Sequence, residues 1–275
     1  MKEQILMSEK QGISTLSEDV IKEADAFCEG YKPFLDYSRT ERDTVKYSIE
    51  LAKKAGFEEF DPEKAYKAGD RVYVNNRDKA LMLAVIGTKG VKEGAQLAIA
   101  HIDSPRIDLK PNPLYEDSEI AYFKTHYYGG IKKYQWVAQP MAIHGALVKK
   151  DGTVVDVVIG EDETDPVLVF SDLLVHLAAN QMDKKASTVI TGEGLDLLVG
   201  NRPLEESKLE KDQKEAVKAN VLYLLKEKYA MAEEDFLSAE LTIVPAGRCR
   251  EVGLDRSLLG AYGHDDRVCA YAEIE

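Results

Sequence analysis

A histidine and an aspartate stand two residues apart in the segment His101-Ile102-Asp103, a spacing that suits metal binding. An imidazole ligates a divalent metal through one ring nitrogen, while a carboxylate accepts a hydrogen bond from the other nitrogen and fixes the tautomer and the ring orientation. A surface histidine and aspartate flanking a turn give the same pattern, and so does a core histidine satisfied by a carboxylate. On its own, the pair indicates His101 as a candidate ligand with Asp103 behind it.

A second cluster, His264-Asp265-Asp266, follows a glycine-containing loop. One carboxylate has two oxygens and can bridge two divalent ions about 3.5–4 Å apart, which makes Asp265 a candidate bridging ligand. Adjacent aspartates before a helix also serve as N-caps, and the residues alone leave this alternative open.

These clusters need elements to hold them, and the hydrophobic pattern predicts helices followed by short strands. Apolar residues at helical spacing predict two helices within residues 17–55, with Ser17 as a cap. From Arg71 the period changes to strand-like runs, RVYVNN, ALMLAVIG and QLAIAH. The run over residues 96–100 leads directly into His101, and active-site residues lie where such strands of an α/β sheet end.

The pattern changes again after Pro105 and predicts a different, β-rich unit. The stretch WVAQPMAIHGALVKKDGTVVDVVIG alternates like paired strands, with DGT as a hairpin turn. Residues 170–182 and 212–229 have helical spacing, AELTIVPAG is strand-like, and the apolar residues after Asp266 predict a last helix.

Composition narrows the class of protein. The chain has 275 residues, 44% of them hydrophobic and 31% charged, which is typical of a soluble globular protein. Its formal charge of -13 disfavours nucleic acid as a partner. The longest apolar run, residues 80–87, is too short to span a membrane, and MKEQILMSEK has no long apolar stretch behind its lysine. Three cysteines without CxxC spacing favour a reducing compartment, so we expect a cytoplasmic protein.

Four motifs in order, AHIDSPRIDLKP, THYYGG, DPVLVFSDLLVHLAANQ and GAYGHDDRVCAYA, resemble the aspartyl aminopeptidase/aminopeptidase I zinc metallopeptidases, with bacterial members the most similar. The resemblance runs from about Ser17 to the last residue. It implies an α/β catalytic domain, with a mostly parallel sheet between helices, interrupted by an inserted β-rich domain that makes subunit contacts. The catalytic domain would comprise residues 1–105 and 248–275, and the inserted oligomerisation domain residues 106–247.

The resemblance also implies roles for particular residues. His101 would bind one metal, Asp103 would orient it or the general base, and Asp265 would bridge both metals, with a cis peptide to Asp266. His176 would be presented to the active site of a partner subunit; the alternative is a histidine packed within its own domain.

Cofactors and partners follow from the same resemblance. The expected cofactors are two divalent ions, zinc first, although cobalt or manganese suits the same donors. The expected substrates are peptides with a free N-terminus, and the expected assembly is a homodimer or a higher oligomer such as a dodecamer. The stretch IKKYQWVAQP has less tryptophan and arginine than eukaryotic aspartyl members, so an acidic N-terminal residue is not implied.

The family pattern also needs a Glu-Glu pair, an aspartate and a histidine after Asp265. The Glu-Glu pairs of this sequence all precede Asp265, so we expect the 275-residue segment alone to be inactive. Two alternatives stay open: a related two-metal deacylase or carboxypeptidase, and a non-catalytic assembly or binding protein.

Overall fold

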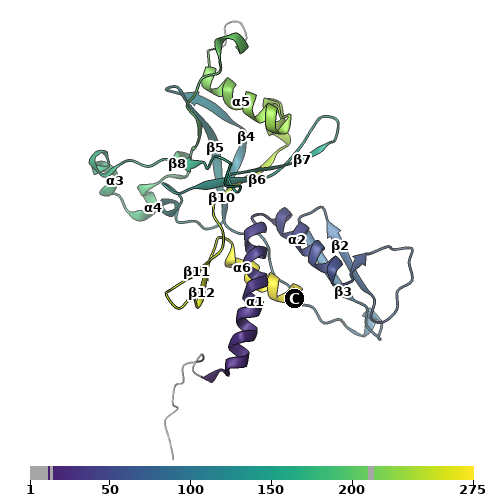
Figure 1. Cartoon of the computed structure of the whole chain (residues 1–275). Coiled ribbons are helices and arrows are strands. Elements are labelled where there is room, and N and C mark those ends of the chain that lie inside the picture. The colour runs from purple at the N-terminus through teal and green to yellow at the C-terminus, as the bar shows by residue number, and fades with distance from the viewer. Residues whose placement is uncertain (1–11, 13–14, 210–213) are drawn as a thin grey trace, which may run out of the picture.

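The computed structural model describes residues 12, 15–209 and 214–275. It contains both helices and sheets, as the α/β interpretation required in its broad form. In Figure 1 a large sheet with a helix over it lies at the top, and a smaller helical lobe with a hairpin lies below. No helix in the described part of the chain is long and apolar enough to cross a membrane.

Two N-terminal helices form the helical lobe, as their apolar spacing predicted. Helix α1 (Glu18–Tyr37) begins at Ser17, whose side chain accepts a hydrogen bond from the Val20 amide, so the predicted cap is confirmed. Helix α2 (Glu41–Lys54) begins with a capping box between Thr40 and Asp43. The buried face of α1 packs against Tyr271 of the last helix, α6 (His264–Ile274). This contact joins the two ends of the described chain.

A three-stranded sheet lies beside α2 (Figure 1). Its strands are β1 (Glu58–Glu59), β2 (Arg71–Asn76) and β3 (Ala80–Val85), in that order. Strands β1 and β2 are parallel, and β2 and β3 form an antiparallel hairpin. Among the strands described, β1 and β2 form the one parallel pair.

The strand predicted over residues 96–100 is wrong. Residues 94–105 have neither helix nor strand, and Leu97 and Ile99 are 76% and 81% exposed. A strand exists only when a neighbour satisfies its backbone groups. No segment of the described chain pairs with this one, so its β-type sequence stays extended but unpaired.

The larger sheet has seven strands in the order β7-β6-β10-β4-β5-β9-β8, and all its pairs are antiparallel. Its strands are β4 (Arg106–Asp117), β5 (Ile120–Tyr128), β6 (Met141–Val148), β7 (Val154–Ile159), β8 (Val169–Phe170), β9 (Leu197–Gly200) and β10 (Glu240–Pro245). The predicted DGT turn joins β6 to β7, and Gly152 adopts the positive φ that such a turn requires. A short pair, β11 (Arg250–Val252) and β12 (Leu258–Gly260), follows the sheet.

Helix α5 (Ala216–Tyr229) lies over the sheet in Figure 1 and buries Val217 and Val221 in its core. The helix was predicted from residue 212; residues 212 and 213 lie outside the described residues. Glu116 caps its first turn by accepting hydrogen bonds of 2.9 Å from the amides of Val217 and Lys218.

The helix predicted over residues 170–182 is also wrong. The segment holds a 3-10 turn, Val175–Leu177, and the single-turn helix α3 (Ala179–Met182), and a second single-turn helix, α4 (Ala186–Val189), follows it. An amphipathic helix draws most of its stability from burying its apolar face. Here Phe170 and Ala178 are buried, but the other large apolar side chains are exposed and the described chain offers no layer to cover them; they are Leu173, Leu174, Val175, Leu177 and Met182.

A buried ionic joint fastens the helical lobe to the large sheet. Arg39, 1% exposed between α1 and α2, places Nε 3.1 Å from Oε1 of Glu161. The same carboxylate lies 3.0 Å from Nε2 of His144 on β6, and Nδ1 of His144 lies 3.2 Å from Oδ2 of Asp43 on α2. The first and last of these contacts are electrostatic approaches without good hydrogen-bond direction, although Nη2 of Arg39 donates to Oε2 of Glu161 at 3.4 Å. Two carboxylates thus face one guanidinium and one imidazole, which balances the buried charge when His144 is protonated.

We predict that Gly145→Ala will destabilise the protein by about 3 kcal/mol or more. A Cβ at Gly145 would overlap the Glu240 carbonyl oxygen of the adjacent strand β10, and the residue has φ +151°. Gly152→Ala is the matched control, because that glycine also has positive φ but has open space around it, so only about 1–2 kcal/mol is expected. Urea unfolding of both variants measures the difference; equal losses would contradict the clash.

The pKa of His144 predicts a pH dependence. Burial alone would lower this pKa, but contacts with Asp43 and Glu161 outweigh burial and raise it above its usual value. A raised folded-state pKa adds stability that is complete below about pH 6.5 and is lost as pH rises through the folded-state value. The free energy of unfolding of wild type should therefore exceed that of His144→Gln most below pH 6.5, and the gap should shrink toward pH 9. A gap that does not change with pH would refute this.

Candidate metal centre

The two clusters singled out in the sequence meet at the seam between the helical lobe and the large sheet. Residues 101–105 form an irregular segment that leads into β4, and Asp265 lies in the first turn of α6. The Ser104 hydroxyl donates a 2.7 Å hydrogen bond to the Asp265 carbonyl, which ties the two segments together. Residues 161 positions apart in the sequence therefore share one site.

The His101 ring lies between two carboxylates. Its Nδ1 is 3.0 Å from the Asp103 carbonyl oxygen and 3.2 Å from Oδ1 of Asp103, and its Nε2 is 3.2 Å from Oδ1 of Asp265. We assign the proton to Nδ1, where it is donated to Asp103, so that the Nε2 lone pair faces Asp265. The predicted role of Asp103 as the residue that orients His101 agrees with this geometry.

The charges around the ring shift both pKa values. Burial is the largest single influence on His101 and would lower its pKa, but the hydrogen bonds and charge of Asp103 together outweigh it and raise the pKa overall. Burial would raise the pKa of Asp103, but the hydrogen bond from Tyr128 and the proximity of His101 lower it overall. Asp103 therefore stays ionised near neutral pH and remains an acceptor for the imidazole N–H.

The donor set fits part of a zinc sphere. Two ligand atoms on one tetrahedral zinc are separated by about 3.3 Å when each bond is about 2.0–2.1 Å. Nε2 of His101 and Oδ1 of Asp265 are 3.2 Å apart, and these side chains are 53% and 86% exposed. Within the described residues, no group of three or more His, Cys, Asp or Glu side chains could hold a metal. The described residues thus bring two potential donor atoms to the distance that one zinc ion would require.

The backbone around Asp265 is irregular. The Asp265–Asp266 peptide is cis, as predicted, and both residues have non-helical backbone angles inside α6. The alternative of N-capping is not what the structure contains, because α6 begins at Gly263 without a side-chain cap. The Asp265 carboxylate instead faces His101.

A cavity of about 340 Å³ opens beside Asp265. Ser104, Trp136 and Tyr262 lie in its wall, together with the glycine-containing turn after β5. The Tyr262 hydroxyl donates to the Pro105 carbonyl oxygen, and burial raises the pKa of Tyr262 to about 12, so this phenol stays neutral. The cavity has room for a small side chain next to the candidate metal ligands.

His176 is exposed on the 3-10 turn Val175–Leu177. Figure 1 places the neighbouring helix α3 at the edge of the sheet, away from α6. Within the described residues, His176 makes no hydrogen bond or ion pair with His101, Asp103 or Asp265. The alternative of a histidine packed within its own domain does not match this exposed position.

Several residues of the site had no clear signal in the sequence. Tyr128 belongs to the THYYGG motif, and the sequence indicates no role for it. In the structure its hydroxyl donates a hydrogen bond to Asp103. Arg267 is 1% exposed, its guanidinium lies 5.6 Å from the Tyr262 ring, and it donates to the Arg39 carbonyl. An arginine that follows two aspartates is expected to be exposed to solvent. Only the tertiary structure shows that Arg267 is buried.

Comparison with known proteins identifies the family. A family model described as aminopeptidase I zinc metalloprotease (M18) matches residues 34–275. The chain belongs to this family. This confirms the resemblance drawn from the motifs.

The M18 relatives are similar throughout the chain. The chain is 48% identical over 279 residues to a probable M18 family aminopeptidase 1 of Clostridium acetobutylicum, covering 100% of this chain and 59% of that protein. The crystal structure of an M18 aminopeptidase of Thermotoga maritima superposes with a TM-score of 0.89 at 45% identity, covering 98% of this chain and 57% of the other. The S. cerevisiae mApe1 dodecamer shares the fold, with a TM-score of 0.66 at 17% identity over 94% of this chain and 56% of that one. The M18 chain described here thus spans somewhat more than half the length of these relatives.

Proposed function

We propose that the complete protein is a two-metal aminopeptidase that removes the first residue from peptides. The observation that carries this proposal is the convergence of His101 Nε2 and Asp265 Oδ1 at 3.2 Å, with Asp103 holding the far side of the imidazole. Membership of a zinc metalloprotease family supports zinc as the metal, and the same imidazole and carboxylate donors suit cobalt or manganese.

Each of the three site residues has a distinct role in the proposed reaction. His101 would hold one metal through Nε2, Asp103 would keep its Nδ1 protonated and fixed, and Asp265 would help to hold both metals. Two divalent ions supply a water of lowered pKa and a Lewis acid for the scissile carbonyl. The cavity beside Asp265 accommodates the N-terminal side chain of the substrate. The described residues place no third ligand beside this pair, so we propose that the 275-residue segment alone is inactive.

We further propose that residues 1–105 and 248–275 belong to a catalytic domain with a mostly parallel sheet, and residues 106–247 to an inserted oligomerisation domain. The packing of α6 against α1 supports the first grouping, because these helices come from the two ends of the chain. The continuous antiparallel sheet from β4 to β10 supports the second. Three free cysteines are compatible with a cytoplasmic location.

The proposed assembly is a homodimer, or a higher oligomer such as a dodecamer. Its support is the apolar surface around His176, since large exposed apolar patches mark interaction sites. In such a dimer His176 reaches the active site of the partner subunit and donates a hydrogen bond to the substrate oxyanion.

The function is tested on the complete, zinc-loaded protein with amino-acid p-nitroanilides. Hydrolysis should require a free α-amine, cease on chelation and return with zinc. His101→Ala should lower kcat/KM at least about 100-fold and reduce bound zinc, because it removes a ligand. His126→Ala is the matched control, an exposed histidine on β5. Equal cleavage of N-acetylated substrates, or activity that resists chelation, would contradict the proposal.

The role of His176 is tested by complementation. His176→Ala should lower kcat about 100-fold or more without changing zinc content, the scale of losing one oxyanion donor. Mixing it with His101→Ala protein should restore part of the activity, because some mixed dimers carry one intact composite site. Unchanged kcat, or no recovery although subunits demonstrably exchange, would assign His176 to its own subunit.

A further inference from the structure

The Asp103 carboxylate is held from two sides. Its Oδ1 lies 3.2 Å from Nδ1 of His101, and its Oδ2 accepts a 2.9 Å hydrogen bond from the Tyr128 hydroxyl. A carboxylate with one fixed oxygen cannot rotate freely about its Cβ–Cγ bond. The hydroxyl of Tyr128 therefore determines which direction the other oxygen presents to the imidazole.

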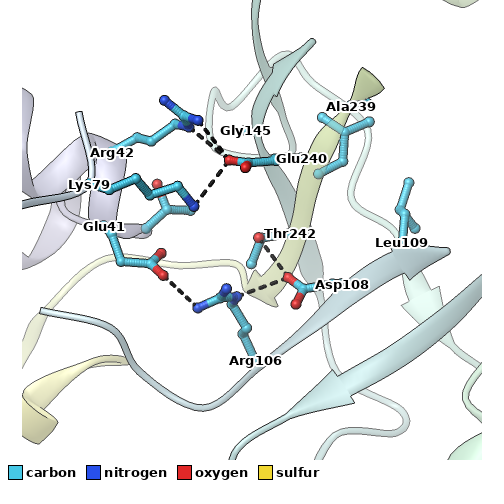
Figure 2. A pocket seen from close by; sticks show the side chains of 12 residues that line it. Glu41, Arg42, Lys79, Arg106, Asp108, Leu109, Gly145, Ala239, Glu240 and Thr242 are labelled. Carbon is cyan, nitrogen blue, oxygen red and sulfur yellow. Dashed lines mark hydrogen bonds and ion pairs between the residues drawn. The ribbon is translucent and has the colours of Figure 1, made fainter. Parts of the chain in front are cut away.

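Tyr128 is itself held by Arg106. The two residues are cross-strand partners on β4 and β5, and the guanidinium carbon of Arg106 lies 4.4 Å from the centre of the tyrosine ring. Arg106 is fixed in turn, because Nη1 donates to Glu41 at 2.8 Å and Nε donates to Asp108 at 2.9 Å. Figure 2 shows Arg106 between these two carboxylates, one from α2 and one from β4. The support for the ring thus spans both the helical lobe and the sheet.

The backbone after Tyr128 adds a second restraint. Gly129 has φ +74°, and a Cβ at this position would lie 3.3 Å from Cα of Pro105. The turn after β5 therefore lies directly against the segment that carries Asp103 and His101. Tyr128 is placed by its ring contact on one side and by this close backbone approach on the other.

We propose that Tyr128 is a positioning residue for the metal-binding imidazole, acting through Asp103. By donating to Oδ2, the Tyr128 hydroxyl leaves Oδ1 to accept the His101 Nδ1 proton and so keeps Nε2 directed at Asp265. Arg106 keeps the tyrosine ring in place. This inference rests on the proposed function in that it takes His101 and Asp265 as metal ligands, and it adds a residue on which their geometry depends.

The test compares Tyr128→Phe with Tyr127→Phe in the complete protein. The first removes the hydroxyl and keeps the ring; the second removes a neighbouring hydroxyl that has no hydrogen-bond partner among the residues described, from a ring that stacks on His126. Tyr128→Phe should weaken zinc binding about 10-fold in chelator competition and change the absorption spectrum of the cobalt-substituted protein. At saturating zinc kcat should fall about 10-fold with KM within about two-fold, and the thermal midpoint should stay within about 2 °C, since removing an exposed hydroxyl leaves the packing intact. Tyr127→Phe should match wild type in every measurement.

A double-mutant cycle shows whether Tyr128 acts through Asp103. In an Asp103→Asn background, Tyr128→Phe should change zinc affinity less than two-fold, because the carboxylate that transmits its effect is gone. Wild-type zinc affinity and cobalt spectrum in Tyr128→Phe, or losses that multiply across the cycle, would overturn the proposal. Zinc binding without peptide hydrolysis by wild type would contradict the aminopeptidase function instead, and the affinity measurements would still decide the role of Tyr128.

Discussion

The buried joint of Arg39, Glu161, His144 and Asp43 is the constraint on which the rest of the structure depends. Charges this far from water are tolerated only when opposite charges and hydrogen bonds accompany them. Here the members come from α2, the connection between α1 and α2, the strand β6 and the segment after β7. Separating the helical lobe from the sheet would break the Arg39–Glu161 and Asp43–His144 contacts and leave the Arg39 guanidinium without its carboxylate, so the two parts keep one relative position.

The candidate metal centre lies on this same seam, so contacts across the seam position its residues. The Arg39 carbonyl accepts a hydrogen bond from Arg267 of α6, the helix that begins beside Asp265. On the other side of the seam, Arg106 connects Glu41 of α2 with Asp108 of β4, next to the segment that carries His101. The segment 101–105 has no strand neighbour to define it, so side-chain contacts such as Ser104 with the Asp265 carbonyl place it. The side chains of a site built on irregular backbone are held in precise positions only when such contacts support them.

Local signals in the sequence were reliable where the element could form from its own residues. The Ser17 cap and the apolar spacing predicted α1, the DGT turn predicted the β6–β7 hairpin, and AELTIVPAG predicted β10. Prediction failed at residues 96–100 and 170–182, which have good strand and helix patterns. Apart from Phe170, which pairs in β8, neither segment belongs to a described strand, and most of their large apolar side chains are exposed without a covering layer within the described chain. A strand or helix with such a pattern forms only when another segment pairs with it or covers its apolar face. The local sequence does not show whether that second segment is present.

The sequence by itself determined the residue types of the site and the family to which the chain belongs. The spacing of His101 and Asp103 made them candidates for a donor and its orienting carboxylate, because two residues so close in the chain must stay near each other. Only the tertiary structure decided that Asp265 lies 3.2 Å from that imidazole and that Tyr128, held by Arg106, supports the far side of Asp103. These contacts join residues that are far apart in the sequence, and their distances depend on the packing of the whole seam rather than on any local pattern.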